Sequence, residues 1–368
     1  MYKRQSFPPG LTAQQQVTLG DDVTLRIGGI LSATAFWQDA MFLPGNGQQA
    51  NIVATELEDS WYGGDARNMR LNLGFEKGNV LDGWSAKATF EMDFFGVFPA
   101  PGAFTDEQPG PRLRLAYADL TNGRTTVRVG QDWSLTLGNV PVSTSHVGFP
   151  FGWGSGGFIG WRFTGVQLHQ TLSAPEAPVT AQLQLGVFKG SWATSDPGDG
   201  PDPGEAGIPQ LEAKLKLGGT TADGTWGAYV AGHFDRKNLN GVREAGEPEL
   251  EDDDLDGWAL EGGANLTRGR VTVQGNAYVG RAMGHHFASL IQFGDIGSWG
   301  VWGQVGLGLD EAKRWSLWLF SGTERPDESD VRESGNERLS SWLVVPMLRF
   351  KAGPYSMGLE VHHNETTY

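Results

Sequence analysis

Apolar and polar side chains alternate at every second position along much of the chain. Between residues 84 and 94, six apolar side chains alternate with five polar ones, which are Ser85, Lys87, Thr89, Glu91 and Asp93. The same period of two recurs in residues 68–75 and 210–217. Successive side chains of a β-strand point to opposite faces, so this pattern predicts strands with one apolar and one polar face.

Almost no segment has the period of an amphipathic helix, and we predict about fifteen strands instead. They cover residues 23–38, 68–77, 84–94, 112–120, 124–134, 158–171, 179–189, 209–217, 225–235, 257–267, 270–281, 299–309, 314–321, 339–351 and 355–363. Several of these runs are longer than the average strand of a soluble protein, which has about 5–6 residues. A strand that crosses a membrane needs about 9–11 residues, so the lengths fit a membrane protein.

The connections between the predicted strands alternate between short and long. The turn at residues 121–123 is short, the connection at 135–157 is long, and no two long connections follow one another. Outer-membrane barrels have short turns on one side and long loops on the other, which produces this alternation. A soluble sandwich with Greek-key crossings has no reason to alternate in this way.

Tryptophans gather near the ends of the predicted strands, as in the aromatic belts of membrane barrels. Those near long connections are Trp37, Trp133, Trp161, Trp258, Trp299 and Trp342, and those near short turns are Trp84, Trp226 and Trp315. The predicted fold is therefore all-β, a transmembrane antiparallel β-barrel. The alternative is a half-solvated antiparallel sheet. That alternative would need a second sheet to cover its apolar face, whereas a barrel faces lipid.

The strand count predicts that a piece of the barrel is absent. Bacterial barrels of this type have even strand numbers, so fifteen strands imply a sixteenth that would pair with residues 23–38. Residues 23–368 would form the barrel without its carboxyl-terminal strand. Met1–Gln5 matches the translation of a widely used sequencing adapter, so we interpret residues 1–22 as non-native adapter residues and an amino-terminal segment.

Composition narrows the class of partner. The chain has 54 glycines and no cysteine, which argues against a disulfide scaffold or a cysteine metal site. The net charge of −15 argues against nucleic acid as a partner, because phosphate binding needs a basic surface.

A barrel of sixteen strands encloses a water-filled channel lined by the polar faces of its strands. The predicted pore-lining residues are Arg26, Arg70, Lys87, Arg112, Arg114, Arg128 and Asp132, which come from the first five predicted strands. Arginine stays charged at any working pH and binds carboxylates through two parallel hydrogen bonds, so such a wall would favour anions. The alternative is that the arginines form salt bridges across strands and only stabilise the barrel.

Residues 135–157 form a long connection without a single charged side chain. An exposed loop should be polar, so we expect this one to fold into the lumen and narrow it. The predicted constriction residues are Ser143, Ser145, His146, Phe149, Phe151 and Trp153. The alternative is that the segment packs at a subunit interface or over a neighbouring molecule.

One other loop suggests a metal site. Residues 235–256 are strongly acidic, and oxygen-rich loops with glycine hold Ca²⁺. The predicted calcium ligands are Asp235, Asn238, Asn240, Glu244 and Glu247. The alternative is a solvated loop, with divalent cations bridging it to lipopolysaccharide phosphates. No other cofactor is expected.

An enzymatic role has little support in the sequence. A barrel hydrolase needs a serine and a histidine paired on the outer wall, and the only nearby cluster is His285, His286 and Ser289, in a loop. His362 and His363 are adjacent on a predicted strand and would point to opposite faces, so they suit one metal ion poorly. We therefore expect no enzyme.

The hairpin at residues 112–134 carries a family resemblance. Its paired arginines, the run AYADL, the tight turn and the run VRVGQDWS resemble the equivalent hairpin of trimeric sixteen-stranded outer-membrane porins of the DcaP-like group. General sixteen-stranded porins fit nearly as well. The resemblance implies a homotrimer in the outer membrane of a Gram-negative bacterium, with Arg112, Arg114 and Arg128 in the pore wall and anionic carboxylates as solutes.

The expected function is a passive diffusion channel for small hydrophilic solutes with a preference for anions. The alternative is a structural or adhesive outer-membrane barrel that is occluded by its own loops.

Overall fold

The computed structural model describes residues 13–19, 22–54, 60–96, 109–146, 149–189, 208–238 and 254–368. Seventeen antiparallel strands form one large sheet. They are β1 (Ala13–Leu19), β2 (Val23–Ile30), β7 (Arg70–Leu81), β8 (Trp84–Gly96), β9 (Gly110–Asn122), β10 (Thr125–Trp133), β11 (Arg162–Thr171), β12 (Val179–Phe188), β13 (Gln210–Thr221), β14 (Gly224–Asn238), β15 (Asp254–Arg268), β16 (Val271–Arg281), β17 (Gly297–Gly308), β18 (Trp315–Pro326), β19 (Ser340–Ala352), β20 (Tyr355–Glu360) and β21 (His363–Thr367).

The remaining elements lie in the connections. β3 (Thr34–Gln38) pairs with β6 (Trp61–Asp65), and β4 (Phe42–Pro44) pairs with β5 (Ala50–Val53). Helical turns occur at η1 (Gly47–Gln49) and η4 (Gly284–His286), and α1 (Glu328–Glu333) lies between β18 and β19. No helix of the described residues is long and apolar enough to cross a membrane.

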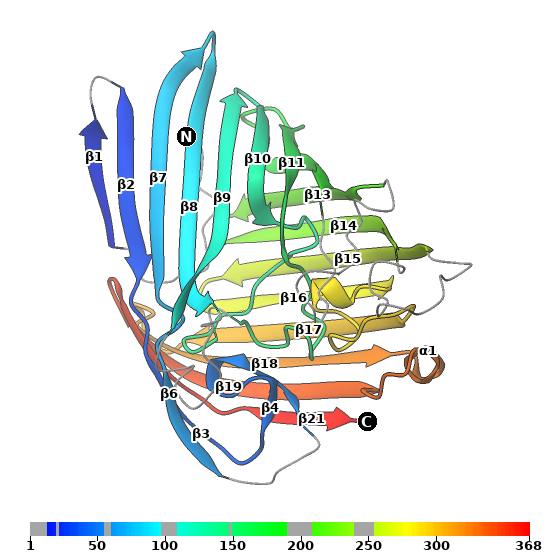
Figure 1. Cartoon of the computed structure of the whole chain (residues 1–368). Coiled ribbons are helices and arrows are strands. Elements are labelled where there is room, and N and C mark those ends of the chain that lie inside the picture. Colours follow the sequence, from blue (N-terminus) through cyan, green and yellow to red (C-terminus); the bar gives the residue numbers. More distant parts are fainter. Residues whose placement is uncertain are drawn as a thin grey trace.

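Each strand of the large sheet pairs with its neighbour along the chain, from β1–β2 and β2–β7 onward to β18–β19. β20 and β21 pair one after the other with the two halves of β19, so together they occupy one strand position. The sheet curves strongly around the segments that lie inside it (Figure 1). Among the described residues, β1 does not pair with β20 or β21, so the sheet is not closed by hydrogen bonds.

The prediction of the strands was correct in order and wrong at the amino end. β1 was missed, because the run of glutamines Gln14–Gln16 hides its alternation. β1 pairs along the whole of residues 23–29, so it occupies the edge of β2 that was expected to await a further strand. The described part of the chain therefore supplies sixteen strand positions. The predicted strand at residues 23–38 is also interrupted, since β2 ends at Ile30 and β3 begins at Thr34.

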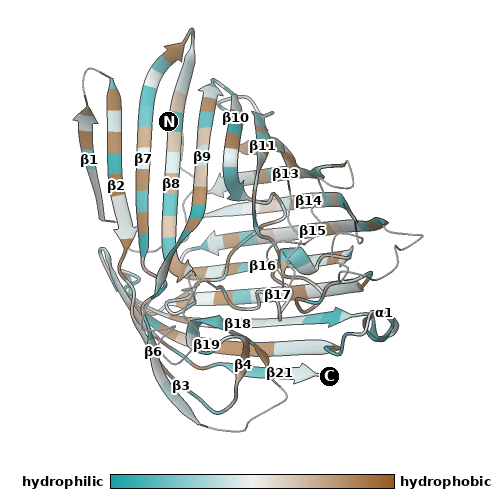
Figure 2. Ribbon diagram, in the orientation of Figure 1, coloured by the Kyte–Doolittle hydropathy of each residue, from teal (hydrophilic) through white to brown (hydrophobic). Residues whose placement is uncertain are grey.

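The burial of apolar and polar side chains in this sheet is the opposite of that in a soluble protein. Large apolar side chains are exposed on the outer face, for example Leu260 at 52% and Leu319 at 53%. Their neighbours on the inner face are buried and polar, for example Glu261 and Gln304. Figure 2 shows the resulting alternation of hydrophilic and hydrophobic bands along the strands. A soluble sheet buries its apolar face, so this arrangement fits a sheet surrounded by lipid.

Not all predicted belt tryptophans lie on the outer face. Trp258, Trp299, Trp315 and Trp342 are exposed there. Trp133 and Trp161 lie inside instead, against Trp153 at ring-centre distances of 5.9 and 5.1 Å. The reason is that β10 ends at Trp133 and the chain then turns inward, so the alternation of faces no longer applies.

The hairpin at residues 112–134 forms as predicted, with its turn at residues 123–124 in place of 121–123. Asn122 pairs with Thr125, which leaves Gly123 and Arg124 as the two loop residues. Gly123 has a φ of 53°, a left-handed conformation that glycine adopts without strain.

Candidate functional site

Arginines and acids alternate along the inner face of five adjacent strands, β7, β8, β9, β10 and β11. We call this set the arginine wall. Its members are Arg70, Glu91, Asp93, Arg112, Arg114, Asp119, Arg128, Asp132 and Arg162. Most are buried, and Arg114 is only 2% exposed.

Salt bridges join most of the wall across strands. Arg112 donates to both oxygens of Asp93, from Nε at 2.9 Å and from Nη2 at 2.7 Å. Arg114 donates to Glu91 at 2.7 Å and to the same Asp93 at 2.8 Å. Carboxylates occupy donor groups of these arginines. Salt bridges across strands were the predicted alternative to a wall of free cations.

Arg128 is held in a similar way. Its Nε and Nη2 donate to the two oxygens of Asp119 at 2.7 and 2.8 Å, and its Nη1 donates to Asp132. Its guanidinium carbon also lies 3.8 Å from the centre of the Tyr117 ring. Asp119 was not predicted as a partner. It faces Arg128 directly in the β9–β10 register, which the hairpin sequence contains.

Arg162 differs from the other arginines of the wall. It is 6% exposed, and its Nε and Nη1 have no hydrogen-bond partner among the described residues. Its guanidinium carbon lies 4.3 Å from the ring centre of Trp161 and 5.0 Å from that of Trp133. A buried cation that lies beside aromatic rings and has two donors without hydrogen-bond partners retains these donors for an anion.

Two predicted pore-lining residues lie nearer the short turns. Arg26 on β2 pairs with Glu76 on β7 at 2.7 Å. Lys87 on β8 is exposed and has no ion pair within the described ranges. It faces Glu76 and Asp119 across the sheet.

The uncharged segment at residues 135–146 crosses the inner face of the sheet. Its backbone groups bond to side chains of successive strands. Leu135 donates to Glu212 and accepts from Lys214 on β13, Val140 accepts from Gln274 on β16, and Val142 exchanges two bonds with Gln304 on β17. Inward polar side chains thus satisfy the buried backbone groups of the segment, which is why it needs no charges of its own.

Glu360 on β20 holds the far end of this segment. Its carboxylate accepts from Thr144 N at 2.6 Å, from Thr144 Oγ1 at 2.8 Å and from Ser143 Oγ at 3.1 Å. Ser145 Oγ also donates to it. His146 is buried beside it, with its ring centre 4.7 Å from that of His362. Burial, followed by the charge of His362, lowers the pKa of His146 to about 3.

The returning part of the segment builds an aromatic cluster inside the sheet. Phe149, Phe151, Trp153 and Phe158 pack with Phe95, Trp302, Phe320, Leu343 and Val345. This cluster borders the arginine wall, because the Arg112 guanidinium carbon lies 5.4 Å from both the Phe95 and Phe149 ring centres. The predicted constriction residues therefore all lie inside the sheet.

Glycines let the segment approach the strands closely. A Cβ on Gly157, which has a φ of 82°, would lie 2.3 Å from the backbone nitrogen of Val301 on β17. A Cβ on Gly322 of β18 would lie 2.4 Å from the carbonyl oxygen of Gly156. Only glycine allows backbone to lie against backbone at these distances.

The predicted calcium ligands are only partly described. Asn240, Glu244 and Glu247 lie outside the described residues, as does the side chain of Asn238. Asp235 is fully buried on the inner face of β14, with an oxygen 2.5 Å from Lys237 Nζ. Calcium binding by this loop stays a hypothesis.

His285, His286 and Ser289 do not form a hydrolase site. Ser289 is buried and its Oγ lies 3.0 Å from Ser298 Oγ, while His285 and His286 contact acidic residues instead. All three lie on the inside, whereas the hydrolase hypothesis needs them on the outer wall. His362 and His363 contact different partners, Glu360 and Glu365, as expected for neighbours on opposite faces.

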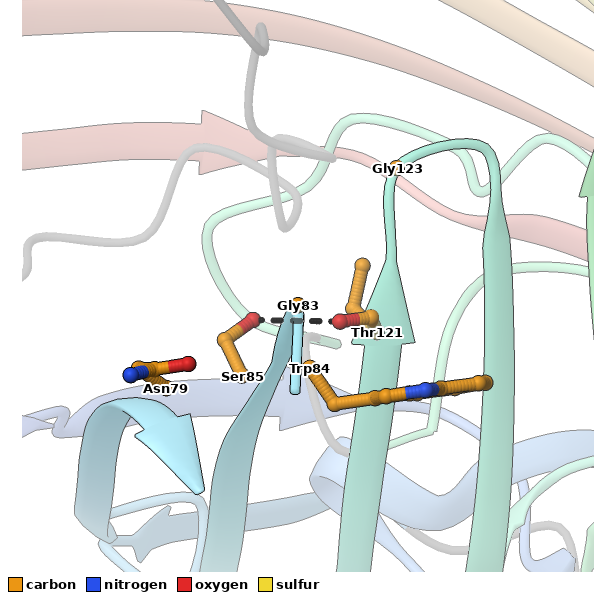
Figure 3. Close-up of a pocket in the computed structure, with 6 residues that line it drawn as sticks. All are labelled: Asn79, Gly83, Trp84, Ser85, Thr121 and Gly123. Atoms are coloured by element: carbon orange, nitrogen blue, oxygen red, sulfur yellow. Dashed lines mark hydrogen bonds between the residues drawn. The ribbon is translucent and has the colours of Figure 1, made fainter. Parts of the chain in front are cut away.

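A shallow recess at the short-turn end adds no chemistry. It is lined by Asn79, Gly83, Trp84, Ser85, Thr121 and Gly123, from the β7–β8 and β9–β10 turns (Figure 3). Its one hydrogen bond between labelled residues runs from Ser85 Oγ to the Thr121 carbonyl at 3.5 Å. None of the six lining residues is charged.

Solved outer-membrane proteins share this arrangement of strands. The outer membrane channel DcaP of Acinetobacter baumannii matches with a TM-score of 0.72 and 19% identity, over 95% of this chain and 92% of that one. The chain has the DcaP-like porin fold. At this identity the likeness is one of fold, and it agrees with the family resemblance of the hairpin.

Two further structures show the same porin fold with lower scores. OmpT of Vibrio cholerae matches with a TM-score of 0.56 and 12% identity, over 95% of this chain and 88% of that one. OmpF of Salmonella typhi matches with a TM-score of 0.52 and 10% identity, over 95% and 100%. No protein-family model and no curated protein matches the chain.

Proposed function

We propose that the chain is an outer-membrane porin of a Gram-negative bacterium that lets small hydrophilic solutes diffuse passively, with a preference for anions and carboxylates. Two observations support residence in the membrane. The outer face of the sheet exposes large apolar side chains, and the fold is that of solved outer-membrane proteins. A lipid-facing apolar surface and a polar interior are what a transmembrane barrel requires.

The observation that carries the anion preference is Arg162. The wall contains five arginines, Arg70, Arg112, Arg114, Arg128 and Arg162, against four acids, Glu91, Asp93, Asp119 and Asp132, so its formal charge is +1. Arg112, Arg114 and Arg128 pair with the acids, and two donors of Arg162, Nε and Nη1, lack hydrogen-bond partners in the described part of the chain. Trp161 and Trp133 beside it would suit a solute that carries both a carboxylate and an aromatic ring.

A homotrimer is part of this proposal. One OmpT structure of Vibrio cholerae, with a TM-score of 0.54, is described as a trimer. Porin trimers bury part of the outer apolar surface between subunits, and this chain exposes such a surface along most of its strands.

A liposome-swelling assay tests the proposed transport. Purified protein in vesicles should admit small neutral sugars, and small monocarboxylates of similar size should enter faster. An Arg162→Gln variant should admit the sugars at the same rate and lose the advantage of the carboxylates. Folded protein that admits no solute at all would instead favour a barrel that its own inward segment and aromatic cluster occlude.

A further inference from the structure

Three histidines from distant parts of the sequence meet on the inner side of the sheet. His233 belongs to β14, and His285 and His286 belong to η4, in the connection between β16 and β17. Each offers one ring nitrogen such that the three nitrogens all lie within 4.8 Å of one another. The three side chains are 5%, 5% and 0% exposed, so the cluster is closed to bulk water.

Two buried carboxylates lie beside these rings, and Asp235 Oδ2 is also 3.7 Å from His233 Nε2. Glu212 Oε1 lies 3.1 Å from His233 Nδ1 and 3.3 Å from His286 Nε2. Asp235 Oδ2 lies 2.9 Å from His285 Nε2. The hydrogen bonds of Glu212 hold a proton on one nitrogen of His233 and of His286 and direct the lone pair to the other nitrogen, as in the outer shell of protein metal sites.

Four ring nitrogens of the cluster have no partner. His233 Nε2, both nitrogens of His285 and His286 Nδ1 make no hydrogen bond with any described residue. Buried polar atoms without partners are rare in native proteins, and four in one cluster point to a ligand. Hydrogen bonding within the protein alone does not account for them.

The charge of the surroundings favours a cation. Glu212 and Asp235 carry two negative charges, and Lys237 carries one positive charge, so with neutral imidazoles the cluster has a formal charge of −1. Lys237 Nζ contacts Asp235 Oδ1 and also donates to the carbonyl of Ala282. Asp235 Oδ2 therefore remains directed to the histidines.

We propose that His233, His285 and His286 bind a divalent transition-metal ion of the zinc type, with a carboxylate or water as the fourth ligand. Imidazole nitrogen suits Zn²⁺, Co²⁺, Ni²⁺ and Cu²⁺, whereas Ca²⁺ and Mg²⁺ take oxygen ligands. Tetrahedral bonds of about 2.0–2.1 Å need the nitrogens closer than their present upper limit, which small side-chain rotations supply.

Such an ion would fasten two inward segments to the sheet. It would join η4 to β14 directly. The carbonyl of His286 also accepts from Gly160 N at 2.8 Å, so the returning end of the uncharged segment is attached to the same place. The metal ion would therefore stabilise the loops that line the lumen.

The test uses the full chain, folded in detergent, freed of any affinity tag and treated with a chelator. Titration with Co²⁺ should give one ion per chain and the visible absorption of tetrahedral coordination, and Zn²⁺ should displace it. Each of His233→Gln, His285→Gln and His286→Gln should weaken binding by about tenfold or more. Zn²⁺ should also raise the melting temperature of the wild type, because it binds only the folded state.

His169→Gln is the matched control, since His169 is another buried inner histidine and contacts Gln167 and Gln184 instead. It should leave Co²⁺ binding unchanged. The wild-type titration tests the proposal even if a variant fails to fold. Absence of stoichiometric binding to the wild type would overturn the proposal. So would binding that survives all three substitutions but is lost in His146→Gln, which would assign the metal to the cluster of His146, His362 and Glu360.

Discussion

The arginines of the wall differ in whether a carboxylate forms a salt bridge with them. Alternation in the sequence placed Arg112, Arg114 and Arg128 on one polar face, and the structure adds a carboxylate partner to each. Arg162 could not be found in this way. It is paired with Trp133 in the register, at the point where both strands leave the regular alternation and the chain turns inward. Alternation alone would have placed Arg162 on the lipid face, together with Val166 and Leu168.

Replacement of Arg162 should change selectivity and leave the fold intact. In Arg162→Gln we expect the ratio of Cl⁻ to K⁺ permeability to fall severalfold, because the cation with unpaired donors is removed. The melting temperature should stay the same or rise, since no protein carboxylate loses its partner. Arg268→Gln makes the same charge change on an exposed pair with Asp223 and should leave the permeability ratio unaltered. An unchanged ratio in Arg162→Gln would remove the basis for the anion preference.

Replacement of Arg114 should instead destabilise the protein. Its loss leaves the buried Glu91 without its closest cation and deprives Asp93 of one of two. We expect Arg114→Ala to lower the free energy of unfolding by about 3–5 kcal/mol, measured by urea titration in lipid vesicles. Arg114→Lys should recover only part of this loss, because lysine cannot form the two-pronged contact. A full recovery would mean that charge alone matters at this position.

At the scale of elements, the uncharged segment was the most informative part of the sequence. The absence of charge in residues 135–157 indicated that it folds against something, and the structure shows that this is the inner face of β13 to β20. Which strands it meets could not be predicted, because that depends on contacts between residues about 80 to 215 positions apart. The histidine cluster was out of reach for the same reason, since His233 meets His285 and His286 only in the folded chain.

The anchor of this segment at Glu360 should weaken in acid. Burial lowers the pKa of His146 to about 3, whereas the imidazole in a released segment has an ordinary pKa near 6.5. The released segment therefore binds a proton more readily, so docking is fully favoured above about pH 6.5 and weakens as the pH falls towards 3. We expect channel current fluctuations to increase over this range.

His146→Asn tests that explanation. The variant removes the imidazole of residue 146. It keeps Glu360 and His362, the other titratable groups at this anchor. The variant should show a much flatter dependence of the fluctuations on pH. If the wild type and the variant respond equally, His146 does not control the docking.

At the scale of the whole molecule, the reversed faces of the sheet were predicted and the strand count was not. The alternation fixes which face meets lipid, because one shift of register would move every apolar side chain inside. It could not reveal β1, whose glutamines give no apolar face, nor the interruption between β20 and β21.

The lipid-facing surface predicts a dependence on depth. Leu260 is exposed near the middle of β15, and Leu309 is exposed beside the turn after β17. Leu260→Arg should cost about 2–4 kcal/mol of folding stability in a bilayer, whereas Leu309→Arg should cost about 0–1 kcal/mol. Equal costs at the two positions, measured by unfolding from vesicles, would argue against a membrane-spanning sheet.

The most direct test of the central claim is the reversal potential of single channels in a planar bilayer under a KCl gradient. The proposed anion-preferring porin predicts discrete open steps and a reversal potential displaced towards the equilibrium potential of Cl⁻. A displacement towards that of K⁺ would contradict the role assigned to the arginine wall. The absence of any conductance from correctly folded protein would contradict the porin function itself.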